Sequence, residues 1–239
     1  MDRLTRHELK QDELRSTFEQ FEQFIKERYQ QILTVAGIVL VVVAAAVGLK
    51  IYLNRQVAEA NTLLTEAITT FRAPVGAPAP GNLDAAAKMF PTAKEKYEKA
   101  LGQFADITQR FPRTKAAAIA RYHVGVCQAE LGDQAGAIKT LTEATGYADK
   151  EIAALAQLAL AGQLVKTGKL AEAVKIYQDL AARPTTTVPR ATALLALADA
   201  YRGGQPGEAR RIYAQLEKEA GTESMLSSYL KQQMESLPK

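Results

Sequence analysis

An apolar run near the amino end constrains this chain more than any other feature. Between Tyr29 and Lys50 the sequence carries no charged side chain, and Ile32 to Leu49 is a run of apolar or small residues. Extended through Leu53, the run reaches about 22 residues, which at about 1.5 Å per residue crosses the roughly 30 Å hydrocarbon core of a bilayer. We therefore expect a transmembrane helix over residues 31–53.

Two other interpretations of this run fit less well. A cleavable signal peptide has a short charged region and an apolar core of about 7–15 residues, whereas here about 30 residues precede a longer core. The patch Ala44-Ala45-Ala46 offers a place for a peptidase to cut, so cleavage stays open as an alternative. A buried helix of a soluble protein would normally be shorter and would carry polar positions.

The charges beside the run decide the membrane orientation only weakly. The basic residues are nearly balanced: Arg15, Lys26 and Arg28 lie before the run, and Lys50, Arg55 and Arg72 follow it. Because basic residues in short flanks favour the cytoplasmic side, the close pair before the run tips the balance slightly towards a cytoplasmic amino terminus. The charges alone leave the side of the membrane on which the remainder of the chain lies nearly undecided.

The segments on either side of the run are predicted to be helical. Residues 1–30 place apolar side chains at helical spacing and form an amphipathic tail, which is a spacer, a membrane-surface helix or a handle for a cytosolic partner. Residues 54–72 continue as a helix with one apolar stripe. The Pro/Gly-rich segment 73–81 cannot continue a helix, and we favour a loop between packed helices over an interdomain hinge because the stripe before it needs a partner.

A repeat occupies the remainder of the chain, over about residues 82–216, within a predicted domain of residues 54–239. Four segments share a small residue, then a large one four positions on, then a medium one three further on, and recur at about 36 residues. The small residues are Ala100, Ala137, Ala173 and Ala209; the large ones are Phe104, Leu141, Tyr177 and Tyr213; the medium ones are Ile107, Ala144, Leu180 and Leu216. This order on one helix face is what close packing against a preceding helix requires.

Turn and cap signals divide each repeat into two helices. Glycines in the turns at 130–133, 166–169 and 202–207 are predicted to end the first helices in the left-handed conformation. Asp133 is a candidate helix cap, Thr92 and Glu95 form a candidate capping box, and Gly125 lies where a small residue lets the paired helix approach. Residues 222–237 are the expected terminal capping helix.

These residues resemble the tetratricopeptide repeat: Gly125, the Gly132-Asp133 turn, the spaced small, large and medium positions, and proline after the second helix at Pro112 and Pro184. The resemblance implies an all-α fold, with one transmembrane helix followed by an α-solenoid of tetratricopeptide-like helix pairs. The order of tail, single span and repeat domain resembles the ancillary SecYEG translocon subunit family of bacterial inner membranes. That resemblance implies an anchor in a bacterial inner membrane, a cytoplasmic amino terminus and a periplasmic repeat domain. It also implies binding to translocon subunits, periplasmic chaperones or client polypeptides.

The sequence contains no pattern typical of catalysis or of a resident cofactor. It lacks a phosphate-binding glycine loop, a dinucleotide fingerprint and a nucleophile elbow. His123 and Cys127 lie four apart, but a metal site needs three or four ligands, and we interpret Cys127 as a small core residue. The net charge of +4 is spread over interleaved signs, which does not favour nucleic acid. We expect no enzyme activity, cofactor, metal or small-molecule substrate.

A surface for protein partners is the remaining expectation. In a stack of helix pairs the first helix of each pair lines one concave face. The candidates for that face are Tyr122, Val126, Leu158, Val165, Leu194 and Tyr201. They are apolar or aromatic and suit an unfolded or amphipathic segment of a partner, although the membrane-proximal or carboxyl-terminal helix of the chain itself is an equally weighted occupant.

Three functions therefore remain open for a non-enzymatic scaffold. The first is an accessory factor of the Sec translocon or of the periplasmic chaperone network. The second is a coordinator of cell-envelope assembly or of cell division. The third is a cytosol-facing anchored receptor, which reverses the membrane orientation.

Overall fold

The fold was analysed in a computed structural model, which describes the backbone of residues 6–76, 89–220 and 225–238. Side chains are described within these ranges from Arg28 onward, except Ile32. Four predicted segments therefore lie partly outside the described residues. They are the tail 1–30, the loop 73–81, the first repeat from residue 82 and the capping helix 222–237. The chain divides into two units, Met1–Arg55 and Gln56–Lys239.

All regular elements of the described residues are helices, with no strand and one isolated parallel bridge between Val75 and Phe90. Helix α1 covers Arg6–Arg72 and contributes residues to both units. The second unit continues with α3 (Ala93–Arg110), α4 (Lys115–Glu130), α5 (Gln134–Thr145), α6 (Lys150–Lys166), α7 (Leu170–Ala182), α8 (Arg190–Tyr201), α9 (Pro206–Ala220) and α10 (Met225–Glu235). The all-α prediction is confirmed for these ranges.

The first unit contains the apolar part of α1. An 18-residue window within Arg28–Arg72 has a mean hydropathy of 2.8, and none of it is buried. Large side chains are exposed on every side of this helix; Leu40 and Val41, for example, are 69% and 65% exposed. The helix is long and apolar enough to span a membrane.

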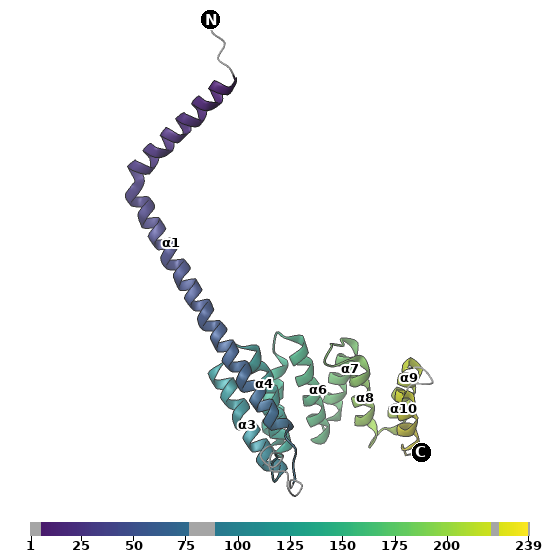
Figure 1. Cartoon of the computed structure of the whole chain (residues 1–239). Helices are drawn as coiled ribbons and strands as arrows, with labels where there is room; N and C mark the ends of the chain where they lie inside the picture. Colours follow the sequence, from purple (N-terminus) through teal and green to yellow (C-terminus); the bar gives the residue numbers. More distant parts are fainter. Residues whose placement is uncertain (1–5, 77–88, 221–224, 239) are drawn as a thin grey trace. The chain divides into compact units, whose positions relative to one another are not determined.

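In the second unit each helix from α3 to α10 packs on the next one along the chain (Figure 1). In addition, α4 contacts α6 and α6 contacts α8, so the first helices of successive pairs also contact one another. The small, large and medium positions of all four repeat segments are buried, from Ala100, Phe104 and Ile107 in α3 to Ala209, Tyr213 and Leu216 in α9. The interval of about 36 residues therefore corresponds to one helix pair.

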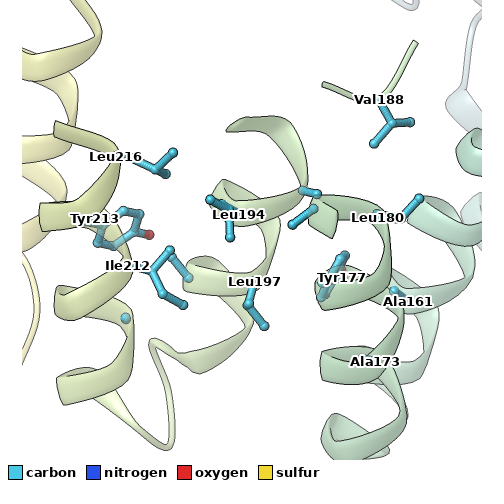
Figure 2. Close-up of a cluster of buried hydrophobic side chains, with 14 of the residues drawn as sticks. Ala161, Ala173, Tyr177, Leu180, Val188, Leu194, Leu197, Ile212, Tyr213 and Leu216 are labelled. Atoms are coloured by element: carbon cyan, nitrogen blue, oxygen red, sulfur yellow. The ribbon is translucent and has the colours of Figure 1, made fainter. Parts of the chain in front are cut away.

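Two clusters of buried side chains form the core of the second unit. One joins residues of the Gln56–Arg72 part of α1, namely Ala60, Leu64 and Ala67, to α3 and α4. The other extends from Leu141 in α5 to Leu237 beyond α10, and its central part is shown in Figure 2. The apolar stripe that precedes residue 73 thus has its packing partner in α3 and α4, within the same unit.

Helix ends follow the predicted cap chemistry in most places. The Asp133 side chain accepts a hydrogen bond from Gly136 N at 2.9 Å, and Thr92 Oγ1 accepts one from Glu95 N at 3.2 Å. Gly132 and Gly168 have φ of +87° and +80° and end α4 and α6 in the left-handed region, as predicted. The same prediction is wrong for the turn at 202–207, because neither Gly203 nor Gly204 has a positive φ. There Gln205 N donates to Tyr201 O, so right-handed turns end α8.

Gly125 makes the closest approach between α4 and α5. A Cβ atom at this position would lie 2.7 Å from Leu141 Cγ and 2.9 Å from Leu141 Cδ2, distances at which the neighbour must shift. The Leu141 side chain is fully buried, so its packed neighbours oppose such a shift. The small residue predicted here is therefore required by the contact with Leu141.

We expect Gly125→Ala to lower the free energy of unfolding by about 1–3 kcal/mol, because overpacking outweighs the better helix propensity of alanine. Gly102→Ala is the matched control: Gly102 lies in α3 with nothing within 4 Å of an added Cβ. The control should be neutral or stabilising by up to about 1 kcal/mol. Equal shifts for the two variants in denaturant unfolding would contradict the contact.

Candidate functional site

The six residues predicted to face a partner come from the first helix of three pairs. Tyr122 and Val126 lie on α4, Leu158 and Val165 on α6, and Leu194 and Tyr201 on α8. All except Leu194 are half-buried, and the α4–α6 and α6–α8 contacts bring their helices together. We call Tyr122, Val126, Leu158, Val165 and Tyr201 the first-helix face.

Leu194 does not belong to this face. Its side chain is 8% exposed and lies in the same buried cluster as Leu197, Ile212 and Leu216 (Figure 2). Helix α8 packs on both α7 and α9, and at Leu194 the neighbouring helices take up the surface that was predicted to face a partner. The assignment of Leu194 to the partner surface is therefore corrected to the core.

The first-helix face is apolar and uncharged. Burial raises the pKa of Tyr122, so its hydroxyl stays neutral at physiological pH. Tyr122, Leu158, Val165 and Tyr201 rest on the buried cluster beneath them, which fixes their positions. An apolar surface of this kind suits an amphipathic or unfolded segment better than a charged ligand.

The membrane-proximal helix was one candidate occupant of this face. In the second unit its Phe71 ring lies 5.6 Å from Tyr97, 6.3 Å from Phe104 and 5.0 Å from His123, centroid to centroid. Arg110 of α3 also forms an ion pair with Glu59. These contacts place residues 56–72 against α3 and α4. The other candidate, the carboxyl-terminal helix α10, packs on α9.

His123 lies inside the aromatic cluster that joins these helices. Its ring stacks on Phe104 at 4.7 Å with an interplanar angle of 10°, and Tyr122 packs edge-on at 5.0 Å. The Nδ1 atom is buried without a hydrogen-bond partner among the described residues. Burial, with a smaller contribution from the nearby charge of Arg72, lowers the pKa of His123 to about 4.

This environment predicts a loss of stability in acid. Between the ordinary pKa of 6.5 and the folded pKa of about 4, the unfolded chain binds the proton and the folded chain does not. The free energy of unfolding should therefore fall by about 2 kcal/mol between pH 7.5 and pH 5 on account of this group. His123→Phe should remove that part of the pH dependence in denaturant titrations, and an unchanged slope would contradict the assignment.

Cys127, four residues from His123, lies in the core of the second unit. Cys127 is fully buried, and burial raises the pKa of its thiol to about 12. The described residues contain no group of three or more His, Cys, Asp or Glu side chains that could hold a metal ion. Cys127 fills space in the cluster with Ala116 and Ala120, which agrees with the interpretation as a core residue.

Two hollows lie away from the first-helix face. One of about 400 Å³ lies between α6, α7 and the segment that follows α7, and includes Lys150, Gln157, Arg183 and Thr185. Another of about 630 Å³ lies where α1 ends, beside Phe90 and Lys99. Neither hollow was predicted from the sequence, because each is formed by residues from segments far apart in the chain.

One polar contact was also missed from the sequence. The Glu151 carboxylate accepts hydrogen bonds from Thr187 N at 2.8 Å, Thr187 Oγ1 at 2.8 Å and Thr186 N at 3.2 Å. These bonds tie the segment before α8 to the start of α6, and they lower the pKa of Glu151. The run of threonines in this loop is visible in the sequence, but the glutamate that accepts their hydrogen bonds lies about 35 residues earlier.

Comparison with known proteins identifies no relative. No protein-family model, no curated protein and no solved structure matches this chain.

Proposed function

We propose that this chain is a non-enzymatic scaffold, held in a membrane by one helix, whose helical unit binds protein partners. The observation that carries the proposal is the exposure of the apolar part of α1, where none of an 18-residue window of mean hydropathy 2.8 is buried. A core helix would be covered by its own protein. A helix with apolar side chains on every side is instead suited to lipid.

We further propose that the helical unit is an α-solenoid of tetratricopeptide-like pairs. The contacts of each helix with the next, together with those of α4 with α6 and α6 with α8, support this arrangement. The buried small, large and medium positions supply the repeated interface between neighbouring helices. Such a stack presents one long surface made by its first helices, here the first-helix face.

The proposed location is a bacterial inner membrane, with a cytoplasmic amino terminus and a periplasmic helical unit. The Lys26 and Arg28 pair before the apolar run supports this orientation. The proposed partners are Sec translocon subunits, periplasmic chaperones or client polypeptides, on the strength of the resemblance in domain order. Coordination of envelope assembly or cell division is the second candidate. A cytosol-facing receptor requires the opposite orientation.

Reporter fusions at the carboxyl end test the orientation. Alkaline phosphatase should be active there, because it needs the oxidising periplasm to form its disulfides, and a reporter that fluoresces only in the cytosol should stay dark. Fusions placed at the amino end should give the reverse pattern. Cytosolic fluorescence from the carboxyl-terminal fusion would instead support the receptor.

A further inference from the structure

The hollow at the end of α1 has walls of two chemical kinds. Pro74, Met89 and Phe90 form an apolar side, while Arg72 and Lys99 bring two positive charges and Thr70 adds a hydroxyl. Its volume of about 630 Å³ falls within the range of small-molecule sites in proteins. None of the described residues that line it is acidic.

The wall segments are fixed by backbone hydrogen bonds. Gly76 N donates to Phe90 O and Phe90 N donates to Pro74 O, both at 3.0 Å, so the segments on either side of the hollow are joined. Ala73 N donates to Thr70 O at 3.2 Å, which turns the chain at the end of α1. The Lys99 Nζ atom lies 5.6 Å from the centre of the Phe90 ring, so a cation borders the apolar wall directly.

The two cations are not neutralised by described neighbours. Acidic side chains of α3 have other partners: Glu98 pairs with Lys94, Asp106 with Arg110, and Glu95 with Thr92. Within the described ranges, neither Arg72 nor Lys99 forms an ion pair. Two positive charges without a described ion-pair partner, set beside an apolar wall, favour a ligand that carries a negative charge on an apolar stem.

We propose that this hollow binds a small amphiphilic anion, such as a carboxylate joined to an aromatic or aliphatic stem. The stem lies against Pro74, Met89 and Phe90, and the carboxylate accepts hydrogen bonds from Arg72 and Lys99. The site is separate from the first-helix face, so it does not depend on the proposed binding of protein partners.

Methionine labelling allows a direct test in the full chain. The sequence has four methionines, of which Met89 lines the hollow while Met225 and Met234 lie on α10. The full chain, labelled with ¹³C-methyl methionine and placed in nanodiscs, is titrated with 4-phenylbutyrate, a water-soluble probe. The methyl signals of the methionines are followed by NMR. The Met89 signal should shift saturably while the Met225 and Met234 signals stay in place.

Charge variants and analogues separate the proposed site from general adhesion. The amine 4-phenylbutylamine and the alcohol 4-phenylbutanol should bind at least about tenfold more weakly than the carboxylate, because only the anion pairs with both cations. Arg72→Gln/Lys99→Gln should weaken 4-phenylbutyrate about tenfold. The control Arg113→Gln/Lys139→Gln makes the same charge change away from the hollow and should leave the affinity unchanged.

Three results would overturn the proposal. The first is a Met89 signal that does not respond to the carboxylate. The second is equal binding of the three analogues, which would indicate an apolar hollow without charge selectivity. The third is preferential binding of a peptide with a carboxyl-terminal leucine over 4-phenylbutyrate, which would indicate a peptide site. None of them bears on membrane anchoring or on the first-helix face.

Discussion

Replacing Val41 and Val42 with arginine is expected to release the chain from the membrane. Both valines lie in the apolar part of α1 and are 65% and 61% exposed. Arginine near the centre of a membrane helix raises the free energy of insertion by about 2.5–3.5 kcal/mol. Each lost valine removes a further ~0.3–0.6 kcal/mol of favourable insertion free energy. The two substitutions together should shift the partition towards water by at least about 10⁴-fold.

The measurement is the fraction of full-length chain that stays with membranes after alkaline carbonate extraction. Val57→Arg/Ala58→Arg is the matched control, because both residues are exposed on the same helix beyond the apolar run. The control should remain in the membrane pellet like the unmodified chain. Retention of the Val41/Val42 variant would show that this helix does not anchor the chain.

Phe104→Ala is expected to be the most damaging single truncation among the described core residues around α3. Phe104 is fully buried, stacks on His123 and contacts Phe71, so its ring joins α3, α4 and the Gln56–Arg72 segment. Removing a buried phenylalanine ring costs about 3–5 kcal/mol. Since Phe104 belongs to only one of the two buried clusters, the loss should be greatest in that cluster.

Hydrogen exchange in the full chain resolves this difference. Amide protection in residues 56–72 and 93–130 should fall much further than in residues 190–220, which belong to the other cluster. Tyr229→Ala, at an aromatic residue that is 44% exposed on α10, should change protection in 56–72 and 93–130 by less than about 0.5 kcal/mol. A uniform loss over both clusters would contradict their separation.

The core of the repeats was predictable from sequence because close helix packing imposes a fixed order of side-chain sizes. Ala137 and Leu141 show the reason: a small residue admits the neighbouring helix, and a large one four positions on fills the space beside it. Caps such as Asp133 were equally predictable, since the acceptor and the backbone donor lie three residues apart. In both cases the residues that determine the structure lie within a few positions of one another, so the sequence alone reveals them.

Features that depend on distant segments could not be predicted. The burial of Leu194 results from the packing of α9 on α8. The aromatic cluster around His123 includes an edge contact with Phe71, which comes from a helix about 50 residues earlier. The turn after Tyr201 contains two glycines, yet its geometry is set by the hydrogen bond from Gln205 N. Of the six residues predicted for the partner surface, Leu194 lies in the core, and the role of the other five stays a prediction.

Photo-crosslinking from the first-helix face tests the central claim most directly. A photoreactive amino acid replaces Tyr122 or Tyr201 in the full chain in living cells, and Tyr229 on α10 serves as the control position outside that face. The scaffold account predicts one discrete protein, a translocon subunit, chaperone or client, crosslinked from positions 122 and 201 and not from 229. Capture of the chain's own helices alone, or the same products from all three positions, would contradict it.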